Sequence, residues 1–395
     1  MPYILNLNAY ESTALAALVI ILGRWLVKHI PFLNKYCIPV PIAGGCAFAL
    51  LHWLLQSVGL IQVEFDKTLM NFFMMVFFCS VGFSASVSML KKGSTKLILL
   101  LVLVSVMCVL QDLLGVGISK LMGVHPCIGL ASGSISLLGG HGTSASYGPL
   151  LEELGISGAN AVAIASATFG LVAGCIIGGP IAVARIRQFN LKSNILPDDE
   201  VISSSGSPKH IPLVAMKFVN ATLLLAISIG IGEVILGLLN EFLVLPTYIG
   251  ALLVATVIRN LMPDEKVPTH EIGVLGNLSL ALFLGLAMIN LKLWELSALA
   301  LPMLTILLCQ VALMVFFAYS IVFRVMGKNY DSAVMTAGFC GFGLGATPNA
   351  IANMEALTDR FGPSPVSYLI VPVVGALFLD FINATVITFF INVFH

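Results

Sequence analysis

The sequence predicts an all-α polytopic membrane protein with two inverted repeats of five transmembrane helices. Each repeat is expected to carry a glycine-rich re-entrant hairpin between its fourth and fifth helix. Of 395 residues, 58% are hydrophobic and only 10% are charged, and the mean hydropathy is +1.03. Soluble domains carry about 25% charged residues, so lipid must be the solvent for most of this chain. The spacing of apolar segments and an internal resemblance between the two halves support the same fold class.

Long apolar segments recur along the chain at the length that a membrane helix requires. A bilayer core of about 30 Å takes about 20 apolar residues per helix. The ten expected spans are residues 10–28, 39–58, 69–89, 96–120, 158–185, 213–239, 245–262, 272–291, 298–326 and 365–393. A polar stretch that includes Pro208 divides them into two sets of five. We therefore expect an N-terminal repeat at 1–188, a linker at 189–211 and a C-terminal repeat at 212–395.

The basic residues predict which side of the membrane each loop occupies. They concentrate around the linker and after the first, third, seventh and ninth spans. The alternate loops hold little more than Lys67, Lys120 and Lys292. Cytoplasmic loops carry an excess of Lys and Arg. We therefore expect the linker in the cytoplasm and both termini on the opposite side of the membrane.

Two glycine-rich stretches resemble each other across the halves. Gly140 aligns with Gly345, which lies 205 residues further along the chain. Each stretch lies between the fourth and fifth spans of its half, which predicts hairpins near 127–153 and 332–358. Because five spans is an odd number, the second half is inverted and the two hairpins enter from opposite sides. Inverted repeats with broken segments that meet near the midplane are typical of secondary transporters.

The composition of these two stretches suits the binding of small ligands. Residues 131–147 are rich in Gly and Ser, and residues 336–353 combine Gly with Thr, Pro and Asn. Neither stretch resembles a continuous membrane helix, and non-helical backbone within a membrane needs protein or water around it. Short helices that begin at such tips direct N–H groups at an anion, while hydroxyl and carbonyl oxygens suit a small cation. The alternative is that small residues here only permit close helix packing.

Four motifs give the chain a resemblance to the bacterial sodium/glutamate symporters. They are GGHGT at 139–143, LKLWEL at 291–296, GFGLGATPNAIANM at 341–354 and RFGPS at 360–364. The resemblance runs along nearly the whole chain. It implies ten helices with two hairpins, a homodimer in the inner membrane with periplasmic termini, and an elevator-like movement. It also implies L-glutamate as the substrate, Na⁺ as the coupling ion and no cofactor. We therefore expect the protein to be a Na⁺-coupled glutamate transporter and not an enzyme.

The residues expected to bind ligands lie at the two tips, in the spans beside them and in the last span. The candidate substrate ligands are Gly140, His141, Gly142, Thr143, Ser144, Thr347, Pro348, Asn349, Asn353, Asp380 and Asn383. The candidate Na⁺ ligands are Ser134, Ser136, Thr168, Asp380 and Asn383. Ionisable residues within membrane spans are functional candidates, and Asp380 shares a helix face with Asn383. The alternative role of this pair is a hydrogen-bond clamp between helices.

Several charged residues leave alternatives open. His141 either contacts the substrate or holds its loop together by hydrogen bonding. Asp112 and Glu233 lie toward the ends of their spans, which favours contacts between helices. The side-chain carboxylate of the substrate has no obvious buried Arg partner, because Arg360 is expected to reach the cytoplasmic surface. If no Arg serves, hairpin amides and hydroxyls carry the acidic specificity.

Other functions fit the sequence less well. A serine hydrolase would need Ser134 or Ser136 beside His141 as nucleophile and base, and no acid partner has a defined place. The GFGLGA motif lacks the βαβ context of a dinucleotide site. The chain has 19 basic and 19 acidic residues, so no basic excess indicates nucleic acid binding. A passive channel, or a Na⁺-coupled carrier of aspartate or a dicarboxylate, is a further alternative.

Overall fold

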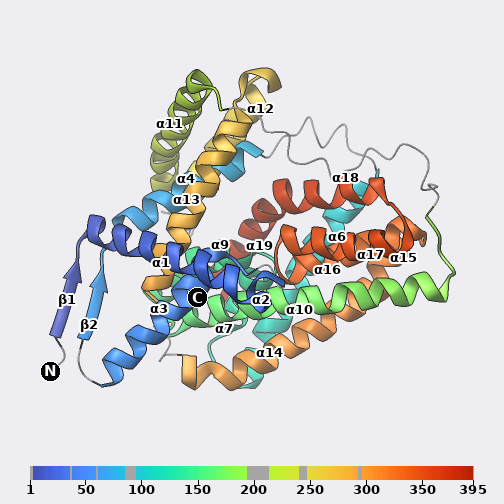
Figure 1. Cartoon of the computed structure of the whole chain (residues 1–395), viewed down its shortest axis with the longest axis horizontal. Coiled ribbons are helices and arrows are strands. Elements are labelled where there is room, and N and C mark those ends of the chain that lie inside the picture. Colours follow the sequence, from blue (N-terminus) through green and yellow to red (C-terminus); the bar gives the residue numbers. More distant parts are fainter. Residues whose placement is uncertain are drawn as a thin grey trace. The chain divides into compact units, whose positions relative to one another are not determined.

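The protein is almost entirely helical in the computed structural model, which describes residues 3–35, 38–58, 61–84, 95–193, 213–239, 247–291 and 296–394 (Figure 1). The first half contains β1 (Tyr3–Leu7), α1 (Ala9–His29), α2 (Pro31–Lys35), α3 (Val40–Ser57), β2 (Ile61–Phe65), α4 (Thr68–Ser84), α6 (Thr95–Leu121), α7 (Pro126–Ala131), α8 (Ser134–Leu137), α9 (Gly140–Glu153) and α10 (Ala159–Gln188). The second half contains α11 (Ala215–Leu239), α12 (Tyr248–Leu261), η1 (Asp264–Lys266), α13 (Thr269–Ile289), α14 (Leu296–Phe317), η3 (Ala318–Val322), α15 (Phe323–Val325), α16 (Tyr330–Leu344), α17 (Thr347–Phe361), α18 (Pro365–Val373), η4 (Val374–Phe378) and α19 (Leu379–Phe394). Most of the expected linker at 189–211 lies outside the described residues, as do residues 85–89 and 245–246 of two expected spans.

Each of the ten expected spans coincides with helical structure, in agreement with a polytopic all-α membrane protein. Among the described residues, seven helices are long and apolar enough to cross a membrane: residues 9–29, 40–57, 95–121, 159–188, 215–238, 269–289 and 299–325. The helices α4, α12 and α19 are shorter and also apolar. Two short strands were not predicted. They pair in parallel, with Tyr3 opposite Ile61.

The last expected span is not one uniform helix. Its first part, α18, contains Pro372, and a five-residue π-helix (η4) follows before α19 begins. Proline removes a backbone donor and clashes with the preceding helical turn. Single π-helical turns occur frequently at functional sites. The wide turn of η4 comes directly before the part of α19 that carries Asp380.

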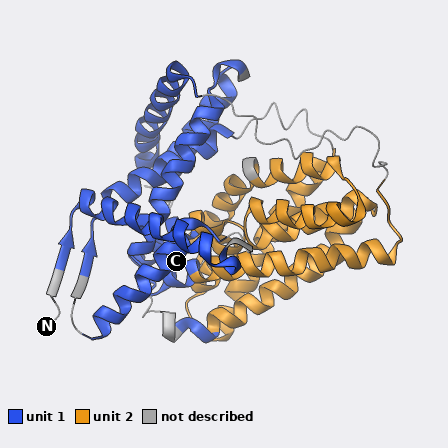
Figure 2. Cartoon of the chain, viewed as in Figure 1, with its two compact units in different colours: residues 1–86, 144–164, 213–301 blue, residues 87–143, 165–212, 302–395 orange. Residues whose placement is uncertain are grey.

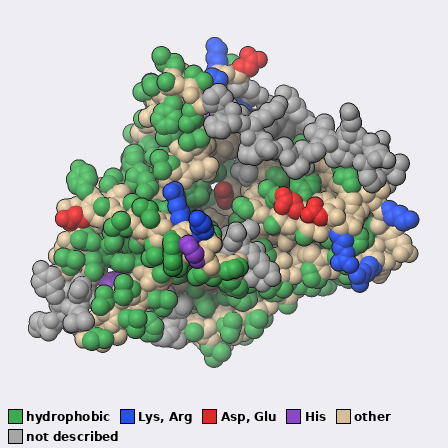
Figure 3. Space-filling view, in the orientation of Figure 1, with side chains coloured by type: hydrophobic (Ala, Val, Ile, Leu, Met, Phe, Trp, Pro, Cys, Tyr) green, Lys and Arg blue, Asp and Glu red, His purple; other side chains and the backbone are tan. Residues whose placement is uncertain are grey.

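Large apolar side chains face outward on the long helices. Val234 of α11 is 68% exposed, Phe316 of α14 is 63% exposed, and Leu308 of α14 is 57% exposed. On the face shown in Figure 3, hydrophobic side chains spread widely and charged side chains gather at a few places. Extended apolar surface of this kind marks contact with a partner or a membrane. It is the surface expected of a protein that lipid surrounds.

The chain folds into two compact units, and each unit draws on both halves of the sequence (Figure 2). Unit 1 comprises Met1–Ser86, Ser144–Ile164 and Leu213–Leu301, and unit 2 comprises Val87–Thr143, Ala165–Pro212 and Pro302–His395. Unit 1 therefore holds α1, α3 and α4 from the first half and α11, α12 and α13 from the second. Unit 2 holds α6, α7, α8 and most of α10, together with nearly all of the chain from α14 to α19.

Glycines let the helices of unit 1 approach one another closely. A Cβ atom on Gly23 of α1 would lie 2.0 Å from Val40 O on α3. A Cβ atom on Gly232 of α11 would lie 2.4 Å from Ala251 N on α12. Close backbone contact at small residues supplies the packing that holds membrane helices together. Unit 1 is thus a tightly packed bundle without a broken helix among its described spans.

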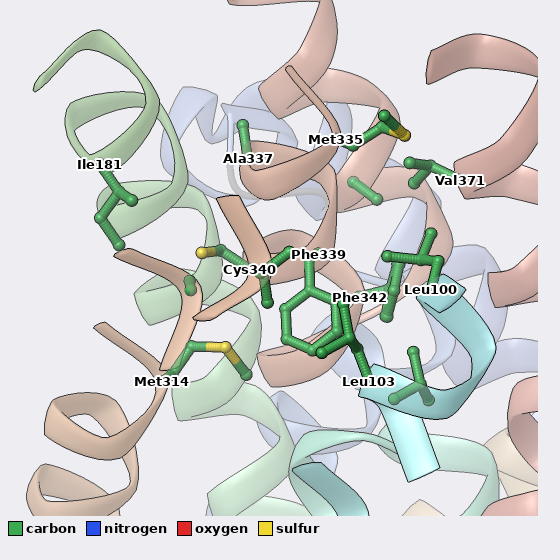
Figure 4. Close-up of a cluster of buried hydrophobic side chains, with 14 of the residues drawn as sticks. Leu100, Leu103, Ile181, Met314, Met335, Ala337, Phe339, Cys340, Phe342 and Val371 are labelled. Atoms are coloured by element: carbon green, nitrogen blue, oxygen red, sulfur yellow. The ribbon is translucent and has the colours of Figure 1, made fainter. Parts of the chain in front are cut away.

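The core of unit 2 surrounds α16, which is the first arm of the second glycine-rich stretch. Residues 332–344 of this helix are all buried. Phe339 and Phe342 belong to one apolar cluster with Leu100 of α6 and Met314 of α14 (Figure 4). A helix that is hydrophobic on all sides is a buried helix. The core therefore fixes the position of the tip that follows α16.

Candidate functional site

The first glycine-rich stretch is broken into three helices, α7, α8 and α9. The first break follows α7, where Gly133 N–H donates to Leu130 O at 3.0 Å. The next N–H group, of Ser134, donates to Asp112 Oδ1 on α6 at 2.9 Å. The second break comes before Gly140, which has φ of +62°. Glycine adopts this left-handed conformation without steric strain.

The second glycine-rich stretch forms two longer helices, α16 and α17, joined by a turn at residues 345–346. A Cβ atom on Gly341 of α16 would lie 2.5 Å from Ala350 Cα of α17, so the two helices touch backbone to backbone. Two predicted substrate residues, Thr347 and Pro348, open α17. Proline suits the first turn of a helix because its missing N–H group is not needed there. No side chain caps the start of α17.

The tips of the two stretches adjoin within unit 2. A Cβ atom on Gly140 would lie 3.1 Å from Gly345 O, so α9 begins next to the turn from which α17 begins. The first N–H groups of a helix have no intrahelical partner, and the helix dipole places positive potential there. Helix starts bind anions such as carboxylates for these reasons. Two of them at one place form a candidate carboxylate site.

The predicted residues of the first tip occupy the start of α9. They are Gly140, His141, Gly142, Thr143 and Ser144. His141 Nε2 lies 3.0 Å from Thr168 Oγ1 of α10, which joins two predicted site residues by a hydrogen bond. Ser144 Oγ donates to Ala163 O at 3.2 Å. The bond of His141 supports the alternative in which this histidine holds the tip together.

The two predicted asparagines of the second tip attach α17 to α10. Asn349 Nδ2 donates to Leu171 O at 2.9 Å, and Asn353 Nδ2 donates to Gly174 O at 2.9 Å. Both asparagines are buried. Within the described part of the chain, Asn349 Oδ1 has no hydrogen-bond partner. The amide nitrogens thus have a structural role, and the Asn349 oxygen is left as an acceptor.

Two of the predicted Na⁺ ligands, Ser134 and Asn383, lie together. Asn383 Nδ2 donates to Ser134 O at 3.0 Å, and Asn383 Oδ1 accepts from the Cys108 thiol at 3.1 Å. Ser134 Oγ donates to Asp112 Oδ2 at 2.9 Å. All four residues are fully buried. The short helix α8 is thereby tied both to α6 and to α19.

The other predicted Na⁺ ligands are not joined to this pair. Ser136 Oγ donates to Gly133 O at 3.3 Å, and Thr168 is bonded to His141. Asp380 of α19 is half-buried and forms no hydrogen bond or ion pair to another described side chain. It shares a helix with Asn383, and no polar bond within the described part of the chain fixes its role.

A buried polar cluster on α6 and α14 was not predicted. Gln111 Nε2 donates to Gly343 O at 2.9 Å, and Gln310 Nε2 donates to Gln111 O at 2.7 Å. Asp112 is expected to contact another helix, and its bonds to Ser134 confirm that contact. The signal in the sequence is an amide or acid inside an otherwise apolar span. Gln111, Asp112 and Gln310 all have this property and are fully buried.

Two charged residues lie away from the tips. Arg360 is exposed in the last turn of α17, and Glu233 is exposed on α11. At 1.5 Å per residue, Arg360 lies about 20 Å along the helix from its start. Its exposure agrees with the expected place at the surface. Arg360 is therefore not a partner for a carboxylate at the tips.

The serine hydrolase alternative does not fit the geometry. His141 Nε2 is bonded to Thr168, whereas Ser134 donates to Asp112 and Ser136 donates to Gly133 O. Covalent catalysis needs a nucleophile and a base within hydrogen-bond reach of each other. Neither serine has that relation to His141.

These features define a polytopic helical membrane protein with a buried polar site at two helix breaks, the class to which membrane transporters belong. The model of the sodium/glutamate symporter family matches residues 5–363. The chain is 41% identical over 392 residues to the sodium/glutamate symporter of Escherichia coli (strain K12), with 98% of each chain covered. It is 40% identical over 390 residues to that of Haemophilus influenzae (strain ATCC 51907 / DSM 11121 / KW20 / Rd), with 96% of each chain covered. The chain therefore belongs to the sodium/glutamate symporter family, whose members are transporters and not enzymes.

Proposed function

We propose that this protein is a secondary active transporter that couples the uptake of L-glutamate to the entry of Na⁺. Membership of the sodium/glutamate symporter family supports both the substrate and the ion. The close approach of Gly140 to Gly345 O supports a substrate site at this place, because it brings the starts of α9 and α17 together. The Na⁺ gradient supplies the energy, and no cofactor is needed.

The tips offer groups that match the chemistry of glutamate. The first N–H groups of α9 and the N–H group of Thr347 bind carboxylate oxygens. At the start of α17 the other groups do not contribute, because Pro348 has no N–H group and Asn349 N–H donates to Ala346 O at 3.0 Å. Thr347 is the first residue of α17, and its hydroxyl donates a further hydrogen bond to the substrate carboxylate. The Asn349 oxygen, buried and without a partner among the described residues, accepts from the substrate ammonium group. Asp380 supplies the negative charge for that ammonium group or for Na⁺.

The two glycine-rich stretches act, in this proposal, as re-entrant hairpins of two inverted repeats. The composition of the units supports this arrangement. Unit 1 holds the first three spans of each half, and unit 2 holds most or all of the fourth and of the fifth span of each half. The glycine-rich stretches differ, because most of α9 belongs to unit 1 whereas α16 and α17 belong to unit 2. The sorting of the spans supports inverted repeats, as in transporters of that architecture.

An elevator-like movement of unit 2 would carry the site across the membrane. All of the predicted ligands except Ser144 belong to unit 2, so they travel together. The protein is further proposed to be a homodimer in the bacterial inner membrane. The distribution of Lys and Arg supports periplasmic termini and a cytoplasmic linker.

Uptake of labelled L-glutamate into proteoliposomes tests this function. The purified protein is reconstituted alone, and an inward Na⁺ gradient is compared with an equal K⁺ gradient. We expect concentrative uptake with Na⁺ and none with K⁺. Equal uptake with Na⁺ and with K⁺, or no uptake with either cation in protein shown to be folded, would contradict the proposal. Competition by unlabelled L-aspartate and dicarboxylates then defines the range of substrates.

A further inference from the structure

Asp112 of α6 is a fully buried carboxylate without a cationic partner. Both of its oxygens accept hydrogen bonds from Ser134, one from the N–H group and one from the hydroxyl, each at 2.9 Å. No Lys, Arg or His of the described residues forms an ion pair with it. Isolated charge in a low-dielectric interior is costly unless it is compensated. A bound cation provides that compensation.

The break after α7 leaves the carbonyl of Gly129, beside this carboxylate, without its helical donor. In a continuous helix, Gly129 O would accept from Gly133 N–H, but that N–H donates to Leu130 O instead. A Cβ atom on Gly133 would lie 2.9 Å from Gly129 O and 3.0 Å from Asp112 Oδ1. Two oxygens therefore converge on one side of the break, at the C-terminal end of α7.

A hydroxyl oxygen adjoins the same carboxylate, because Ser134 Oγ lies 2.9 Å from Asp112 Oδ2. Gln111 O also lies near Gly133 but already accepts from Gln310 Nε2 and is not counted. The set comprises one carboxylate, one carbonyl and one hydroxyl. In transporters with broken helices, unwound carbonyls and the ends of half-helices coordinate Na⁺. A single negative charge matches a monovalent cation.

We propose that Asp112, Gly129 O and Ser134 Oγ form a Na⁺ site that is separate from Asp380. This inference rests on the Na⁺ coupling proposed above. When Na⁺ binds, the Ser134 hydroxyl turns its proton away from Asp112 and offers its oxygen to the ion. No covalent bond is made or broken.

The site is connected to the first tip through Asn383. Asn383 Nδ2 donates to Ser134 O, and the same nitrogen would lie 2.6 Å from a Cβ atom on Gly139. Gly139 directly precedes Gly140, where the candidate carboxylate site begins. An ion at Asp112 therefore fixes α8, and α8 fixes the start of α9. Na⁺ binding at this place prepares the tip for the substrate.

Na⁺ binding to the purified protein in lipid nanodiscs, without glutamate, tests the site. Thermal stability is measured as NaCl replaces choline chloride at constant ionic strength. The substitution Asp112→Asn keeps an acceptor for Ser134 N–H and removes the charge. We expect it to raise the half-saturating Na⁺ concentration by more than about tenfold, as losses at metal sites commonly do. Ser134→Ala keeps the N–H group and removes the hydroxyl ligand. It should raise the half-saturating Na⁺ concentration less than Asp112→Asn does.

Asp331→Asn is the matched control, because Asp331 Oδ1 also accepts from a serine hydroxyl, that of Ser364 at 2.6 Å. It should keep the wild-type response to Na⁺. An unchanged response in Asp112→Asn would overturn the proposal and leave Asp112 as a cap of α8. If Asp112→Asn does not fold, Ser134→Ala is used instead, and an unchanged response to Na⁺ in that variant would overturn the proposal. A wild-type protein that shows neither Na⁺ stabilisation nor Na⁺-driven uptake would overturn the proposed function itself, which is a different result.

Discussion

The two glycine-rich stretches resemble each other in sequence but differ in backbone structure. Gly133 and Gly338, which lie 205 residues apart, align in this resemblance, yet the helix breaks at Gly133 and continues through Gly338. Their surroundings explain the difference. A Cβ atom on Gly338 would meet Val371 and Met354 side chains, whereas one on Gly133 would meet three oxygens. Asp112 accepts the Ser134 N–H group that the broken helix no longer uses. Among the described residues, no carboxylate takes this part beside Gly338.

The two stretches are alike in how they are anchored. The first is tied to α19 of the second half by the bond from Asn383 to Ser134 O. The second is tied to α10 of the first half by bonds from Asn349 and Asn353. In both cases an asparagine amide donates to a backbone carbonyl. In our proposal, the break at Gly133 creates the ion site, while both tips contribute to the substrate site.

The largest expected effect comes from the contact between α16 and α17 of the second stretch. Gly341→Val should prevent folding, because its Cβ atom would lie 2.5 Å from Ala350 Cα. The yield of monodisperse protein in size-exclusion chromatography measures this. Gly179→Val is the control, since nothing lies within 4 Å of a Cβ atom there. A folded, active Gly341→Val protein would contradict the backbone contact.

Loss of the Asp380 charge should abolish coupling without loss of the protein. Asp380→Asn should lower Na⁺-driven uptake by more than about tenfold. The yield should stay normal, because Asp380 has no partner among the described residues to lose. Uptake into proteoliposomes is compared with that of Asp359→Asn, a change at an exposed residue of α17. Normal Na⁺-driven uptake in Asp380→Asn would remove Asp380 from the site.

Because asparagine bonds anchor both glycine-rich stretches, removing one bond from either stretch should lower the stability by a similar amount. Asn383→Ala and Asn353→Ala each remove a buried hydrogen bond to a backbone carbonyl, at a cost of about 0.5–1.5 kcal/mol. The free energy of unfolding in SDS-containing mixed micelles measures this loss. Asn260→Ala, at an exposed residue of α12, should change it by less than about 0.5 kcal/mol. A loss at only one of the two anchors would show that the anchoring is not shared.

The smallest expected effect belongs to the start of α17. Thr347→Val removes one hydroxyl contact to the substrate, and a hydrogen bond contributes about 1 kcal/mol. The half-saturating glutamate concentration should therefore rise about fivefold. Thr385→Val, at an exposed residue of α19, should leave it unchanged. Equal kinetics in both variants would place the substrate away from Thr347.

Composition alone predicts the ten helical spans, because each apolar segment must satisfy its backbone in lipid. The glycine and hydroxyl content of the tips also predicts a binding site there, and this stays a prediction. The anchoring roles of the asparagines are not predictable in this way, since Asn349 and its acceptor Leu171 O are 178 residues apart. The same holds for Asp112, whose importance depends on a helix break that the equivalent Gly338 does not produce. The strands β1 and β2 were missed because each has only five residues.

The position of bound L-glutamate is the most direct test of a substrate site at two helix starts. It is measured by cryo-electron microscopy of the protein in lipid nanodiscs with saturating Na⁺ and L-glutamate. We expect a substrate carboxylate in contact with the first turns of both α9 and α17, next to Gly140 and Gly345. Glutamate bound elsewhere, with both helix starts free of substrate, would contradict the site.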